Sequence, residues 1–174
     1  MCPMRSPYWM LVVGGALGLD TTQGRDISRY VGVDICEYAI RMAKNEVLEN
    51  KKVHEATFHV CDLCEFTPER DSVFDAIVFN EVLYYLDVTD AVVQLNRYLN
   101  WLSPRGIFCV SMKDDSKSKA VFRATLRRFE ALRSVLFQAS RHRVRYRIFK
   151  SRESRAYLIS ALRPIPNGLA DRYE

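Results

Sequence analysis

Up to residue 112, short apolar runs alternate with stretches that have the period of an amphipathic helix. An apolar run without polar alternation indicates a strand buried on both faces, as in a parallel sheet covered by helices. Such runs predict strands at residues 10–13, 30–34, 76–79 and 107–112, and residues 55–60 alternate well enough to predict a further strand. Because strands that alternate with helices are joined by right-handed crossovers, this order predicts a mostly parallel α/β sheet.

Segments with helical periodicity lie between these strands and after them. The expected helices cover residues 19–29, 37–50, 91–102 and 117–138. The last of these has apolar side chains at helical spacing at Phe122, Leu126, Phe129, Leu132 and Leu136. Pro104 and Gly106 are expected to end the third helix and to turn the chain back towards the sheet.

The period changes from helical to two near the end of the chain. Residues 143–148 alternate between arginine and apolar positions, which indicates a half-buried strand. Residues 154–162 are expected to pair with it in antiparallel orientation. We therefore expect residues 1–163 to form one domain and residues 164–174 to form a C-terminal tail.

The apolar segment near the start of the chain has two interpretations. Arg5 followed by apolar residues 8–19, with small residues near the end of that run, is typical of a secretory signal peptide. Alternatively, residues 10–13 are the first strand of the sheet and lead into Gly14, Gly15 and Gly18. In that case the glycines allow a sharp turn and a close approach of the backbone to a ligand.

Length, cysteine content and hydropathy narrow the class of protein. A chain of 174 residues is long enough to fold around one core without disulfides or metals. Five cysteines, an odd number, favour reduced thiols and a cytoplasmic protein. Cys61 and Cys64 have the spacing of half a zinc site, but no second pair follows, so we expect no metal. No apolar run is long enough to span a bilayer, and we expect no membrane partner.

Charge divides the chain into two unlike parts. Residues 1–112 contain 10 Lys and Arg against 15 Asp and Glu, whereas residues 113–174 contain 16 against 6, which gives the total of +5. A basic C-terminal third is compatible with an anionic partner such as nucleic acid, although a solvated basic surface explains it equally well.

Polar residues follow the expected strands at the edge where α/β sheets bind ligands. Asp34 follows the second strand, Asp62 the third, and Asn80 with Glu81 the fourth. A glycine turn after the first strand and an acid after the second are what a nucleoside site needs, because the carboxylate accepts hydrogen bonds from ribose hydroxyls. Asp34 and Asn80 could instead cap the helices that follow. The glycine turn lacks a Lys-Ser/Thr ending, which argues against nucleoside triphosphate hydrolysis.

This combination resembles the class I S-adenosylmethionine-dependent methyltransferases, and residues 81–86 look like small members of the nodulation type. The motifs that carry the resemblance are residues 14–18, 30–35, 61–63, 74–86 and 102–106. The family implies a Rossmann-like, doubly wound sheet of seven strands with an antiparallel last strand, in a three-layer αβα sandwich. It also implies S-adenosyl-L-methionine as the cofactor.

The resemblance further implies a set of cofactor contacts. Asp34 would hold the ribose, Asp62 and Leu63 would flank the adenine, and Asn80 and Glu81 would lie near the methionine part and the sulfonium. The full implied set is Gly14, Gly15, Gly18, Asp34, Ile35, Asp62, Leu63, Asn80 and Glu81. No catalytic base is assigned, although Glu81, Tyr84, Tyr85 and His142 are candidates. The expected methyl acceptor is a small molecule.

Two positions depart from the family pattern. Val12 stands where the family has an acid, and Ala16 stands where it has its middle glycine. An alternative function is therefore a methyltransferase-like binding or regulatory module that has lost its cofactor, with an anionic partner such as RNA. A nicotinamide-dependent reductase is a third interpretation, because Tyr146 and Lys150 have the spacing of its catalytic pair. That pair would have to lie on a helix, whereas period two predicts a strand here.

Overall fold

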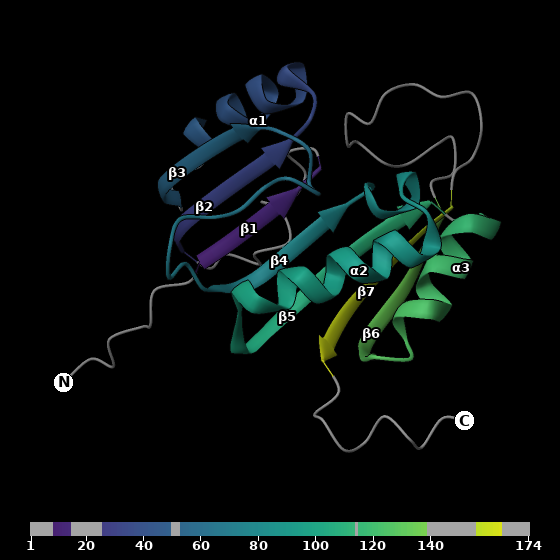
Figure 1. Cartoon of the computed structure of the whole chain (residues 1–174). Coiled ribbons are helices and arrows are strands. Elements are labelled where there is room, and N and C mark those ends of the chain that lie inside the picture. Colours follow the sequence, from purple (N-terminus) through teal and green to yellow (C-terminus); the bar gives the residue numbers. More distant parts are fainter. Residues whose placement is uncertain (1–8, 15–25, 50–52, 114, 139–155, 165–174) are drawn as a thin grey trace.

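The computed structural model describes residues 9–14, 26–49, 53–113, 115–138 and 156–164 (Figure 1). The strands are β1 (Trp9–Val13), β2 (Ile27–Asp34), β3 (Val53–Val60), β4 (Phe74–Asn80), β5 (Leu102–Lys113), β6 (Phe129–Gln138) and β7 (Ala156–Pro164). The helices are α1 (Glu37–Glu49), α2 (Val88–Tyr98) and α3 (Ser116–Thr125), with short 3-10 turns η2 (Leu83–Tyr85) and η3 (Leu99–Trp101).

The seven strands of the described residues belong to one sheet in the order β3-β2-β1-β4-β5-β7-β6. Neighbouring strands from β3 to β5 are parallel, whereas β7 is antiparallel to both β5 and β6. The expected α/β sheet with an antiparallel last strand is therefore confirmed. The chain passes from β3 at one edge to β4 beyond β1, so the direction of winding reverses between β1 and β4, where such sheets bind ligands.

Helices cover both faces of this sheet, which confirms the three layers (Figure 1). On one face, Leu11 and Val13 of β1 share an apolar cluster with Leu95 of α2. On the other face, Met10 and Val12 share a second cluster with Val47 of α1. Alternate residues of β1 thus point into opposite cores, which explains why its sequence is apolar throughout.

The leading apolar segment is a central strand of the sheet. β1 lies between β2 and β4, with Val13 opposite both Val33 and Phe79. The four residues Met10 to Val13 are almost completely buried. The interpretation of residues 10–13 as the first strand of the sheet is therefore confirmed.

The long helix expected over residues 117–138 is wrong. α3 ends at Thr125, and the chain turns and becomes strand β6 from Phe129. β7 pairs with β6 and β5 instead of with the expected strand at residues 143–148, which lies outside the described residues. The apolar spacing of residues 122–136 fits a helix, but nine residue pairs with neighbouring β7 are available only to a strand, so tertiary pairing overrides the local pattern.

Three boundaries also differ from expectation. Ile27 to Arg29 belong to β2 instead of a helix over residues 19–29, of which residues 19–25 lie outside the described part. Residues 103–106 lie within β5, where the pairing with β4 shifts from Phe74↔Leu102 to Ala76↔Ile107. They form a bulge in the strand. Proline has no backbone N–H to donate to the neighbouring strand, and a bulge is a point where the pairing does not require one. β7 runs to Pro164, one residue past the expected domain boundary.

Candidate active site

The tips of β1 to β4 lie side by side at one edge of the sheet. The backbone register pairs Val13 with Val33 and with Phe79, and pairs Asp34 with Val60. The next residues along the chain are Gly14, Ile35, Cys61 and Asn80. The N–H of Gly14 donates to the carbonyl of Val33 at 2.9 Å, and the N–H of Cys61 donates to the carbonyl of Asp34 at 3.1 Å. These bonds extend the sheet and hold the first three tips together.

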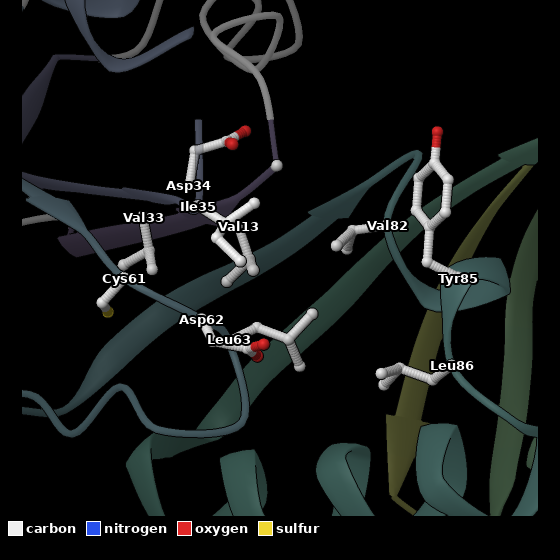
Figure 2. A pocket seen from close by; sticks show the side chains of 11 residues that line it. Val13, Val33, Asp34, Ile35, Cys61, Asp62, Leu63, Val82, Tyr85 and Leu86 are labelled. Atoms are coloured by element: carbon white, nitrogen blue, oxygen red, sulfur yellow. The ribbon is translucent and has the colours of Figure 1, made fainter. Parts of the chain in front are cut away.

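A cavity lies beside these tips (Figure 2). Its volume is about 190 Å³. Figure 2 shows side chains from the ends of β1, β2 and β3 on one side and Val82, Tyr85 and Leu86 on the other. The lining consists of Val13, Gly14, Val33, Asp34, Ile35, Cys61, Asp62, Leu63, Val82, Tyr85 and Leu86. Residues 15–25, which follow Gly14, lie outside the described part of the chain.

Asp34 and Asp62 are the charged side chains of this lining, and each is held by its own turn. Asp34 Oδ1 accepts a hydrogen bond from the N–H of Cys36 at 2.7 Å, and Asp62 Oδ1 accepts one from the N–H of Cys64 at 2.7 Å. A carboxylate that bonds the backbone two residues onwards stabilises a turn. Both carboxylates are therefore fixed in position at the cavity before any ligand binds.

Gly14 fits where a larger residue would not. Its φ of +80° lies in the left-handed region, and a Cβ placed there would come within 2.4 Å of the carbonyl oxygen of Asn80. The tips of β1 and β4 can therefore approach closely only because residue 14 has no side chain. Gly15 and Gly18 lie outside the described residues, so their expected contacts stay predictions.

Asn80 and Glu81 lie at the tip of β4 but are not part of the cavity lining. Asn80 Oδ1 accepts a hydrogen bond from the Ser111 hydroxyl at 2.7 Å, which ties β4 to β5. Glu81 has a φ of +55°, and its N–H donates to the carbonyl of Ser111 at 3.0 Å. A non-glycine residue in this region is strained, and such strain is concentrated near functional sites.

Glu81 also makes contact with the turn that follows it. The Tyr84 hydroxyl donates to Glu81 Oε2 at 3.2 Å, and the rings of Tyr84 and Tyr85 lie 4.7 Å apart. Burial raises the pKa of Tyr84, and the neighbouring Tyr85 and Glu81 raise it further. Tyr84 therefore stays a neutral hydrogen-bond donor at physiological pH.

Sequence reasoning missed part of the lining. Val82 and Leu86 were not expected in the site, and Tyr85 was named only as a candidate base. They are contributed by the segment between β4 and α2, which folds back over the edge of the sheet through the 3-10 turn η2. The only sequence pattern that could have indicated these residues is the apolar run 82–86, and this run fits a buried helix equally well. Val13 and Val33 were expected only as strand positions, and Cys61 was expected only as part of the motif at residues 61–63, with no contact of its own.

The thiols beside the cavity have little nucleophilic character. Burial raises the pKa of Cys61, as do the carboxylates of Asp62 and Glu65. Burial also raises the pKa of Cys64, and a hydrogen bond with Asp62 acts in the same direction. Both side chains are therefore neutral thiols at pH 7. Within the described ranges, no three His, Cys, Asp or Glu side chains gather closely enough to hold a metal ion.

The fold is that of an α/β protein with a cavity at the switch point of its sheet, where such proteins bind ligands. The sequence matches the methyltransferase domain family over residues 15–152. The chain belongs to this family and is a class I S-adenosylmethionine-dependent methyltransferase. No protein among the curated sequences matches it.

Solved structures of methyltransferases share the fold. The N-methyltransferase NodS from Bradyrhizobium japonicum, in complex with S-adenosyl-L-homocysteine, has a TM-score of 0.67 at 19% identity, covering 90% of this chain and 78% of NodS. A putative methyltransferase from Thermoplasma acidophilum has a TM-score of 0.65 at 15% identity, covering 95% and 72%. Magnesium protoporphyrin IX methyltransferase from Synechocystis, with bound S-adenosylmethionine, has a TM-score of 0.56 at 15% identity, covering 89% and 70%.

No helix in the described part of the chain is both long enough and apolar enough to cross a membrane.

Proposed function

We propose that this methyltransferase holds S-adenosylmethionine in the cavity at the tips of β1 to β3 and methylates a small-molecule acceptor in the cytoplasm. One observation carries the proposal: Asp34 and Asp62, at the tips of neighbouring strands, line the same cavity as the apolar side chains of Ile35 and Leu63. The two carboxylates can accept hydrogen bonds from the hydroxyl and amino groups of a nucleoside, and the apolar side chains can contact its base.

The residues present fit the adenosyl part of the cofactor. Ile35 is 71% exposed although it is large and apolar, and Leu63 faces the same cavity. An adenine ring between them would cover apolar surface that now contacts water. Asp34 would accept hydrogen bonds from the ribose hydroxyls, while its bond from Cys36 keeps the carboxylate in place.

The departure at Val12 is also explained by the fold. Val12 is buried in the apolar cluster beneath α1, on the opposite face of the sheet from Leu11 and Val13. A carboxylate in that side-chain position would be surrounded by Met10, Ala76 and Val78. We therefore assign no cofactor contact to residue 12, and the proposed site depends on Asp34 and Asp62 for its polar groups.

The chemistry requires alignment more than acid or base groups. When bound, S-adenosylmethionine supplies a methyl group that its sulfonium already activates. The protein's part is to fix the adenosyl end through Asp34 and Asp62 and to exclude water with the apolar lining. Tyr85, which is 75% exposed at the far side of the cavity, is placed to contact an acceptor.

Two features support a small acceptor and a cytoplasmic setting. Two described connections border the cavity and carry no inserted domain: residues 81–87 join β4 to α2, and residues 61–73 join β3 to β4. The described cysteines Cys36, Cys61, Cys64 and Cys109 are free thiols, which suits a reducing compartment.

Calorimetric titration tests the cofactor site. Wild-type protein should bind S-adenosyl-L-homocysteine, and Asp34→Ala should weaken binding by at least about tenfold, because hydrogen bonds to a charged group contribute about 1.5–3 kcal/mol. Asp26→Asn is the control, since Asp26 is exposed before the other end of β2. A wild-type dissociation constant weaker than about 1 mM, which is barely 4 kcal/mol of binding, would contradict the proposal and favour the cofactor-free binding module.

A transfer assay tests the acceptor. The purified protein is incubated with S-adenosylmethionine labelled on its methyl group and with cell extract separated into small-molecule, protein and RNA fractions. Label should enter the small-molecule fraction and be lost with Asp34→Ala. Label in protein or RNA alone would overturn the proposed acceptor class, while leaving the cofactor site intact.

A further inference from the structure

The segment of residues 61–67, which carries Asp62 and Leu63 into the cavity, has no helix or strand of its own. Its internal hydrogen bonds all converge on Asp62, whose carbonyl accepts from Glu65 at 3.0 Å and from Phe66 at 2.9 Å. These bonds shape a turn, but they do not determine how the turn lies against the rest of the molecule. Contacts with another element must do that.

Arg97 on α2 makes those contacts. Its guanidinium Nη1 donates to the carbonyls of Cys64 at 2.7 Å and Leu63 at 3.2 Å. Its Nη2 donates to the carbonyl of Phe66 and to the Thr67 hydroxyl at 3.3 Å. One side chain therefore satisfies four oxygen atoms spread over five consecutive residues.

Tyr98, the next residue of α2, reaches the same segment from the core. Its side chain is 0% exposed, and its hydroxyl donates to the Leu63 carbonyl at 2.9 Å. Burial raises the pKa of Tyr98, so its hydroxyl keeps the proton that it donates. The carbonyl of Leu63 thus accepts from both Arg97 and Tyr98, while the Leu63 side chain lines the cavity.

The guanidinium itself is held on three sides. Its Cζ lies 5.2 Å from the centre of the Trp101 ring and 5.9 Å from that of Tyr98, and Gln94 Oε1 accepts from Nη1 at 3.2 Å. A planar cation stacked on aromatic rings can direct several N–H groups to fixed points, which an ammonium group cannot do. Lysine at this position would keep the charge and lose most of the hydrogen bonds.

We propose that Arg97 and Tyr98 are positioning residues that fix Leu63 and Asp62 for the adenine of the cofactor. This inference rests on the proposed function, because it gives that segment the adenine. Neither residue lines the cavity, so each would act through the backbone of residues 63–67. We call the hydrogen bonds from Arg97 and Tyr98 to residues 63–67 the clamp. If the clamp is removed, the segment occupies its binding conformation for a smaller fraction of the time, and the apparent dissociation constant rises in inverse proportion to that fraction.

Binding measurements on Arg97→Lys and Tyr98→Phe test the inference. Titration with S-adenosyl-L-homocysteine and with adenosine should show dissociation constants raised by about tenfold for Arg97→Lys and by a smaller factor for Tyr98→Phe. Both ligands should lose affinity equally, because the effect lies at the adenine. The double variant should lose less than the product of the two factors, since both side chains donate to one carbonyl.

A second readout follows the segment directly. Hydrogen exchange of the amides of residues 62–67 should speed up in Arg97→Lys, while exchange in β4 and β5 stays as in the wild type. Arg105→Lys, an exposed arginine in the β5 bulge, is the control and should change neither quantity. Urea unfolding of each variant reports its global stability, so that loss of folded protein is separated from loss of affinity.

The outcomes separate this inference from the proposed function. Wild-type protein that binds neither ligand would overturn both. Wild-type binding with unchanged affinity and exchange in Arg97→Lys would overturn the clamp alone. A loss of affinity no larger than the loss of folded protein would also overturn it, because the arginine would then be purely structural.

Discussion

Gly14 shows how a single residue allows the tips of β1 and β4 to meet. Its φ of +80° is unfavourable for any residue with a side chain, and the space that a Cβ needs is filled by the backbone carbonyl of Asn80 at 2.4 Å. The N–H of Gly14 meanwhile donates to Val33 of β2. The residue therefore connects three strand tips and leaves no room for a substitute.

Gly14→Ala should be costly for these reasons. We expect the free energy of unfolding to fall by about 1–3 kcal/mol, the usual cost of a residue held in left-handed backbone, or by more if β4 must move. Urea unfolding followed by circular dichroism measures the change. Gly106→Ala is the comparison, because residue 106 needs no positive φ. Its Cβ would come within 2.8 Å of the Leu102 side chain and 3.0 Å of the Ser103 carbonyl oxygen, so a smaller but measurable loss is expected. Equal losses in both variants would contradict this account of Gly14.

Among the residues that line the cavity, the sequence predicts those that directly follow a strand and few others. Asp34, Ile35, Asp62 and Leu63 could be placed at one edge because parallel strands align their carboxyl ends. Tyr85 could not be placed, since its position depends on how residues 81–87 fold over that edge. The contacts of Arg97 with residues 63–67 link segments 30 to 34 positions apart, and no local pattern indicates them.

The helices start in different ways, and this difference has a measurable consequence. Asp115, the N-cap of α3, accepts a hydrogen bond from the N–H of Ser118 at 2.8 Å. Asp87, the N-cap of α2, has the same residue type and makes no such bond. The two caps therefore form a natural pair of test and control.

Asp115→Ala should lower the free energy of unfolding by about 0.5–2 kcal/mol at pH 7, and Asp87→Ala should lower it by less. The N–H of Ser118 holds the pKa of Asp115 below its ordinary value of 3.8. A carboxyl whose folded pKa is lowered stabilises the protein above its unfolded pKa and loses this effect as the pH falls through the folded value. The difference between wild type and Asp115→Ala should therefore shrink below about pH 3.8, as urea unfolding at pH 7 and pH 3 would show. A difference that is constant with pH would contradict the cap.

The element that the sequence failed to predict is β6, and the reason is physical. No glycine or proline marks the end of α3, where Leu126 and Arg128 close the turn with ordinary backbone bonds to Phe122 and Thr125. Apolar residues continue at helical spacing across that end, so the local pattern contains no stop signal. The strand is determined by pairing with β7, which begins at Ala156, eighteen positions after β6 ends at Gln138. By contrast, β1, β4 and the buried parts of β2 and β5 were predictable because buried parallel strands are apolar throughout, and β3 was predictable from its alternation of apolar and polar residues.

At the scale of the whole molecule, one apolar cluster connects the edge that carries the cavity with the antiparallel edge. Leu11 and Val13 of β1, Phe108 of β5 and Leu162 of β7 belong to the same core, which α2 and α3 cover. Phe108 also lies opposite Leu162 in the sheet, and its ring packs 5.6 Å from that of Phe129 in β6. The final strands therefore share their stability with the half of the sheet that carries the site.

This shared core predicts that the sheet unfolds as a unit. Leu162→Ala removes a side chain that is 0% exposed, so the free energy of unfolding should fall by about 2–5 kcal/mol. Tryptophan fluorescence and far-ultraviolet circular dichroism should still give coincident urea transitions, because β7 cannot detach without opening the core around Phe108. Val93→Ala, at a position 52% exposed on α2, is the control and should change stability by no more than about 0.5 kcal/mol. Two separate transitions in Leu162→Ala would mean that β6 and β7 form an independent unit, and the edge that carries the cavity would then be stable without them.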